Sequence, residues 1–143
     1  MQSQTSLKIF KVLAWFAAIY HFILGLLGIF APASIVVPIV KTIYGVSPNV
    51  DAQFLYMAKF IAAYMIAFAI ATAILAYKPV EYRKLVWVPI SLFVIRIFER
   101  VFFFGLLTEA FNISFAQDLR VIIPITLIAI GLYYFRPRQT ATA

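Results

Sequence analysis

Three charged residues, Arg96, Glu99 and Arg100, lie within a segment that is otherwise apolar enough to cross a membrane. In a helix, their spacing of i, i+3 and i+4 places the side chains on one face. One carboxylate cannot balance two guanidiniums, so this face carries excess positive charge. Guanidiniums stay protonated and bind carboxylates or phosphates through paired hydrogen bonds. Because charges inside a membrane are costly and generally functional, the triplet predicts a site for an anionic or strongly hydrogen-bonding group.

The single histidine, His21, also lies within an apolar segment. Small residues share its side of a helix: Ala14, Ala17, Ala18, Gly25 and Gly28. Such a face allows another helix or a flat ligand to approach closely, and an imidazole there can bind the metal of a haem or a chlorophyll. Because one histidine without a second ligand is a weak metal signal, a hydrogen bond to Glu99 or Tyr64 on a neighbouring helix is the simpler interpretation.

The composition indicates an integral membrane protein. Hydrophobic residues make up 65% of the 143 positions and charged residues 12%, whereas soluble domains carry about 25% charged residues. The absence of cysteine excludes thiolate catalysis, disulfide exchange and iron-sulfur clusters. The net charge of +7 comes from basic residues that flank apolar segments, so we exclude nucleic acid as a partner.

Four apolar segments approach the length of about 20 residues that a membrane-spanning helix needs. They cover residues 7–30, 53–77, 85–107 and 115–135. The first is longer than the apolar part of a secretory signal peptide, so we interpret it as a span. The predicted fold is all-α: one transmembrane domain over residues 1–143, built as a four-helix bundle.

Residues 33–45 stay apolar between the first two spans but are interrupted by Pro38, shortly after Pro32. This pattern predicts a short interfacial helix on the membrane surface, with Lys41 and Tyr44 turned toward the lipid headgroups. Tyrosines near span ends are typical of an aromatic belt, so we assign Tyr44 no chemistry.

Capping signals mark where two of the spans begin. Ser47 followed by Pro48 has the form of an N-cap and a first-turn proline, which predicts that the second spanning helix starts there. Ser114 and Gln117 match a capping box, so the fourth helix is expected to start near Phe115.

Basic residues gather in the flanks on one side of the predicted bundle: Lys8, Lys11, Lys78, Arg83, Lys84, Arg136 and Arg138. The opposite flanks carry Lys41 and Arg120 among several acids. Because positive residues stay on the cytoplasmic side, we expect a multi-pass inner-membrane protein with both termini in the cytoplasm.

With this orientation, the rise of about 1.5 Å per residue gives each polar side chain a depth. The predicted ligand-binding layer near the middle and outer half of the bundle contains His21, Lys59, Arg96, Glu99 and Arg100. Two alternatives stay open. The charged triplet could pair internally or with Asp118 and Glu109 to fix helix packing, and Lys59 could extend its charge to the membrane surface.

The sequence shows no G-x-S-x-G, H-E-x-x-H or phosphate-binding glycine loop, and no pair of intramembrane aspartates. We therefore predict no catalytic residues, no metal site apart from His21 as a candidate tetrapyrrole ligand, and no enzymatic activity.

Gly25-x-x-Gly28, Ala31-Pro32, the long first outer segment and the charges at 96, 99 and 100 resemble the layout of the small DoxX-like membrane proteins. The resemblance implies a small bacterial inner-membrane protein. Proteins of that group have largely unsettled functions, and some are linked to respiratory complexes. It assigns no functional residue in this chain.

We expect a non-catalytic protein. It either docks onto other membrane subunits or a second copy of itself, or it binds membrane lipid or another anionic lipophilic ligand through the polar layer. Lipid, quinone and tetrapyrrole are the candidate bound groups. One alternative is a small carrier or membrane enzyme acting on an anionic lipophilic substrate. Another is a haem- or pigment-binding subunit that uses His21. Whichever of these functions holds, we expect Glu99→Gln to destabilise the protein, because two arginines would lose their counter-charge.

Overall fold

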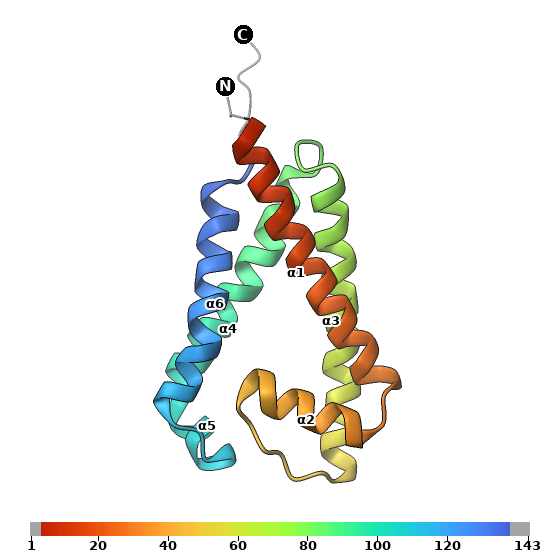
Figure 1. Ribbon diagram of the computed structural model, residues 1–143, viewed down its shortest axis with the longest axis vertical. Coiled ribbons are helices and arrows are strands. Elements are labelled where there is room, and N and C mark those ends of the chain that lie inside the picture. The colour runs from red at the N-terminus through yellow and green to blue at the C-terminus, as the bar shows by residue number, and fades with distance from the viewer. Residues whose placement is uncertain (1–3, 138–143) are drawn as a thin grey trace.

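Residues 4–137 are described by a computed structural model, and every regular element in that range is helical (Figure 1). The elements are α1 (Gln4–Phe30), α2 (Ala33–Tyr44), α3 (Ala52–Tyr77), a 3-10 turn η1 (Arg83–Val86), α4 (Trp87–Phe102), α5 (Phe104–Phe111) and α6 (Phe115–Tyr134). The predicted all-α class is confirmed. Arg138, one of the basic residues used to predict orientation, lies outside the described residues.

Three helices, α1, α3 and α6, are long and apolar enough to cross a membrane, which indicates a membrane protein. The prediction of one continuous helix over residues 85–107 is wrong. Helix α4 has 16 residues and ends at Phe102, the chain turns at Phe103, and α5 follows. Three successive phenylalanines and Gly105 surround this break, and aromatic residues and glycine are weaker helix formers than alanine or leucine.

The helices form two packed pairs, α1 with α3 and α4 with α6. Figure 1 shows the pairs converging where α1 begins and α6 ends, and spreading apart at the opposite end, where α2 lies between them. At the converging end the core is filled by Phe10, Leu75 and Leu132. Side chains therefore pack densely at one end, and cavities remain at the end where the pairs diverge.

The small-residue face of α1 is covered by α3. A Cβ atom at Gly25 would lie 2.6 Å from Ile66 Cγ1 and 3.0 Å from the carbonyl oxygen of Ala62. A Cβ atom at Gly28 would lie 2.6 Å from the Cβ of Ala62. The two backbones thus approach more closely than side chains at these positions would allow.

A short helix, α2, forms in the segment predicted to be an interfacial helix, with Pro38 inside it and Gly45 at its C-cap. The backbone of Gly45 is left-handed, with φ of 72°, and its N–H donates to the carbonyl of Lys41. Glycine adopts this conformation without steric cost, so the chain leaves the helix sharply. Lys41 is exposed, but Tyr44 is half-buried and turns toward α4, so its predicted orientation toward the headgroups is wrong.

The predicted start of α3 at Ser47 and Pro48 is also wrong. Residues 45–50 form no regular structure, and Asp51 is the N-cap. Its carboxylate accepts a hydrogen bond of 2.7 Å from the N–H of Phe54. A carboxylate neutralises the positive end of a helix better than a hydroxyl, so Asp51 is the better cap.

The start of α6 follows the prediction. Ser114 is the N-cap and forms a reciprocal capping box with Gln117, and α6 begins at Phe115.

In the loop between α3 and η1, Lys78 Nζ lies 2.9 Å from Glu81 Oε2. The hydrogen bond from Lys78 holds the pKa of the Glu81 carboxyl below its ordinary value. This loop lies at the same end as the first turn of α1 and the last turn of α6 (Figure 1).

Candidate ligand-binding site

Two cavities, of about 590 Å³ and about 200 Å³, lie between the diverging helix pairs. The larger is lined by residues of α1, α2, α3, α4 and α5, and the smaller by residues of α1, α2, α4 and α6. His21, Tyr44 and Arg96 line both cavities. These three side chains therefore form the boundary between the two spaces.

The larger cavity is almost entirely apolar. Its walls include Leu24, Val40, Met57, Ile61 and Phe68. The polar side chains among the residues that line it are His21, Tyr44, Tyr64 and Arg96. A cavity of several hundred Å³ with apolar walls and few polar groups is typical of sites for small lipophilic molecules.

Arg96 carries the charge at the boundary. The side chain is half-buried, and its guanidinium carbon lies 5.7 Å from the centre of the Tyr44 ring, a cation–π contact. Within residues 4–137, Arg96 forms no ion pair with a carboxylate. The aromatic ring stabilises the cation but does not neutralise it, so the positive charge beside the cavities stays available to an anion.

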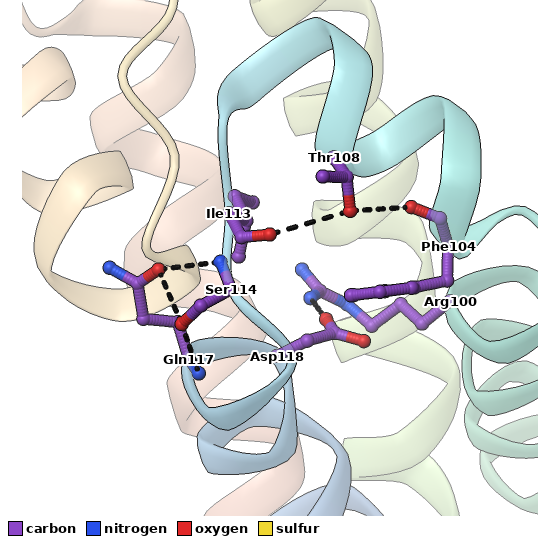
Figure 2. A network of polar contacts seen from close by, with 7 residues as sticks. All are labelled: Arg100, Phe104, Thr108, Ile113, Ser114, Gln117 and Asp118. Carbon is purple, nitrogen blue, oxygen red and sulfur yellow. Dashed lines mark hydrogen bonds and ion pairs between the residues drawn. The ribbon is translucent and has the colours of Figure 1, made fainter.

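Arg100 is neutralised within the protein. Figure 2 shows its guanidinium, from α4, directed at Asp118 in the first turn of α6. The two form a hydrogen-bonded ion pair, and both side chains are buried. Asp118 Oδ2 is buried without a hydrogen-bond partner in the described part of the chain. The alternative in which Arg100 pairs with Asp118 is thus the arrangement that the structure adopts.

Nearby hydrogen bonds fix the loop between α5 and α6, which directly precedes the helical turn that carries Asp118. The hydroxyl of Thr108 donates to the carbonyl of Phe104 at 3.0 Å and lies 3.4 Å from that of Ile113 (Figure 2). The N–H of Ser114 donates to Gln117 Oε1 at 2.8 Å. These bonds hold the α5–α6 connection, and with it the first turn of α6, against Arg100.

Glu99 and Lys59 are not brought to the cavities. Glu99 is exposed and has no ion-pair partner among the residues from 4 to 137, so the expected internal pairing with Arg96 or Arg100 does not form. Lys59 Nζ donates to the carbonyl of Ile29 at 2.6 Å, in the last turn of α1. A cation there satisfies a carbonyl that the end of the helix leaves unpaired.

His21 lies at the boundary of the cavities in a cage of aromatic rings. Its Nδ1 donates to the carbonyl of Ala17 at 2.8 Å, so Nε2 of the neutral ring is an acceptor. The expected hydrogen bond to Glu99 or Tyr64 is therefore wrong, since the partner is one turn back on the same helix.

Nε2 of His21 is buried and has no hydrogen-bond partner in the described range. The ring of Phe68 packs against the imidazole with 4.6 Å between centroids. A group of three or more His, Asp, Glu or Cys side chains that could hold a metal ion does not occur among residues 4–137.

The sequence alone did not identify two residues of the candidate site, Tyr44 and Arg120. Tyr44 was placed in the aromatic belt, and Arg120 was counted only as a flanking charge, yet both line the smaller cavity. The signal for Tyr44 was its position at the end of a short helix next to Gly45, where the chain can turn inward. The signal for Arg120 was its position four residues before Pro124, near the start of α6.

The site therefore combines a large apolar space, two arginines without a carboxylate partner in the described residues, and the imidazole of His21. Among residues 4–137, no side chain that lines the cavities is a serine, threonine or cysteine nucleophile paired with a base. Comparisons with protein-family models, curated proteins and solved structures give no match for this chain.

Proposed function

We propose that this protein binds a single-chain lipophilic anion, with the apolar chain in the larger cavity and the anionic group at Arg96. The observation that carries the proposal is a guanidinium without an acidic partner in the described residues, placed at the edge of an apolar cavity of about 590 Å³. An anion there would gain charge-assisted hydrogen bonds while the apolar walls receive its chain.

The same proposal places the protein in the bacterial inner membrane as a non-catalytic binder, with both termini in the cytoplasm. Helices α1, α3 and α6 are three crossings, and α4 together with α5 is the fourth. Support comes from Lys78, Arg83 and Lys84, which lie in the loop at the end where α1 begins. The ligand cavities then lie toward the outer half of the bilayer, next to α2.

The test compares dodecanoic acid with dodecanol in nanodiscs of phosphatidylcholine, using native mass spectrometry or displacement of a fluorescent probe. We expect dodecanoate to bind and dodecanol to bind far more weakly. Arg96→Gln should weaken dodecanoate binding about 10- to 100-fold, because a hydrogen bond to a charged group contributes roughly 1.5–3 kcal/mol.

Arg83→Gln is the matched control, since Arg83 lies in η1 and lines neither cavity. Arg96→Lys keeps the charge and should retain part of the preference for the anion, which separates loss of charge from misfolding. Equal binding of acid and alcohol to the wild-type protein, or a dodecanoate affinity that Arg96→Gln leaves unchanged, would contradict the proposal.

A second candidate function rests on Glu99. Its side chain is exposed on α4 among exposed apolar neighbours, which include Val94, Ile95, Phe98 and Phe102. An unpaired carboxylate facing lipid is costly. A helix of another membrane subunit that presents a lysine or arginine at this depth would remove the cost, and the protein would then be an accessory subunit.

Native mass spectrometry of nanodiscs formed directly from the membrane tests this candidate. We expect an assembly of fixed stoichiometry that Glu99→Gln abolishes. Glu109→Gln, which changes an exposed carboxylate in α5, should leave the assembly intact. A monomer in the wild-type sample, or an assembly that survives Glu99→Gln, would rule the candidate out.

A further inference from the structure

One more arginine lines the smaller cavity than the larger one. Arg96 and Arg120 are among the residues that line it, and neither has a carboxylate partner within residues 4–137. Arg96 is half-buried and Arg120 is exposed, whereas Arg100, the neighbouring cation on α4, is already neutralised by Asp118. Two arginines that carry no counter-charge in the described residues therefore border this cavity of about 200 Å³.

Hydrogen-bond acceptors lie beside these cations. His21 Nε2 is buried and unpartnered in the described residues, and the His21 side chain lines both cavities. Pro124 also lines the smaller cavity, and it lies inside α6. Because proline has no N–H, the carbonyl of Arg120 lacks its normal helical partner. Arg96, Arg120, His21 and Pro124 thus all border the smaller cavity.

We propose that the anionic group of the ligand is a phosphate monoester, which occupies the smaller cavity while its alkyl chain lies in the larger one. This inference rests on the proposed function and specifies its ligand. The chain would pass the boundary formed by His21, Tyr44 and Arg96, which are common to the two cavities.

The charge count favours a phosphate over a carboxylate. A carboxylate carries one charge, and a single guanidinium satisfies it through two parallel hydrogen bonds. A phosphate monoester carries about −1.5 to −2 charges at pH 7 and has three acceptor oxygens, so it can engage two guanidiniums at once.

The experiment compares dodecyl phosphate, dodecanoic acid and dodecanol, which share one chain length, in phosphatidylcholine nanodiscs. We expect dodecyl phosphate to bind about 10-fold or more tightly than dodecanoate, the gain expected from a second charged hydrogen-bond pair. Arg120→Gln should remove this preference and leave dodecanoate binding nearly unchanged. Arg120→Lys should keep part of it.

Lys41→Gln is the control, because Lys41 is an exposed cation on α2 that lines neither cavity. Inorganic phosphate provides a further arm: it should compete with dodecyl phosphate only weakly, because it has no chain to fill the larger cavity. Strong competition by inorganic phosphate would show that the site binds a free anion and would contradict the proposal that the phosphate group belongs to a lipid.

The outcomes separate the two levels of the proposal. If dodecanoate and dodecyl phosphate both bind better than dodecanol, but equally and without regard to Arg120, the phosphate inference fails and the binding of a lipophilic anion stands. If neither anion binds better than dodecanol, the proposed function fails as well.

Discussion

Asp118→Asn is expected to lower the free energy of unfolding by about 3–5 kcal/mol, the cost of removing one partner from a buried ion pair. Asp118 and Arg100 are both buried and pair with each other. The amide of asparagine cannot neutralise the guanidinium, which would then stay buried without a counter-charge. Reversible unfolding in mixed micelles, titrated with SDS, measures the change.

Glu99→Gln is the control for this measurement. It neutralises a carboxylate one residue away from Arg100, but Glu99 is exposed and unpaired in the described residues. We therefore expect little change in stability, which reverses the expectation drawn from the sequence. A larger loss for Glu99→Gln than for Asp118→Asn would show that the pairing is wrongly assigned.

The double variant Arg100→Met with Asp118→Leu separates charge from packing. It removes both members of the pair and leaves no isolated charge, so most of the stability lost in Asp118→Asn should return. If the double variant is as unstable as Asp118→Asn, the loss comes from packing around α6 and not from an uncompensated guanidinium.

Gly25→Val is the second substitution for which we expect a large effect, a loss of about 2–3 kcal/mol from overpacking. A side chain at position 25 meets the carbonyl oxygen of Ala62 and the backbone nitrogen of Ile66, neither of which can rotate away. Helices α1 and α3 would have to separate. Because His21 lies one turn from Gly25, binding of dodecanoate should weaken in the same variant.

Gly105→Ala is the matched control. A Cβ atom at Gly105 has no neighbour within 4 Å, and alanine favours a helix over glycine by about 1 kcal/mol. The control should therefore leave stability unchanged or raise it slightly. SDS titration of both variants gives the comparison, and equal stability of Gly25→Val and the wild type would contradict the close backbone contact.

Helical segments and their ends were largely readable from the sequence. Runs of apolar residues locate α1, α3 and α6, and the capping box at Ser114 locates the start of α6. The start of α3 was misassigned because Ser47 followed by Pro48 also has the local form of a helix start, although Asp51 is the better cap. Only the folded chain shows that residues 45–50 are used to return from α2 to α3.

The proximity of Arg96 to His21 was predictable, but the direction of each side chain around its helix was not. Arg96 and His21 were expected at similar depth, and the structure places both at the same cavities. Glu99 and Arg100 are adjacent, so they point about 100° apart around the helix axis. That rotation directs Arg100 to Asp118 and leaves Glu99 exposed. Sequence spacing predicts which side chains share a helix face, but it does not predict which neighbouring helix packs against each of them.

The close contact of α1 with α3 has a consequence for how ligand preference can evolve. The tight packing against Ala62 fixes that side of the larger cavity at Gly28, so few substitutions there are tolerated. The facing wall comes from α2, where Val36, Ile39 and Val40 line the cavity. Helix α2 has no fully buried residue. If the protein binds the proposed ligand, mutations in α2 are expected to change which chain length or shape is accepted, while the rest of the protein keeps its fold.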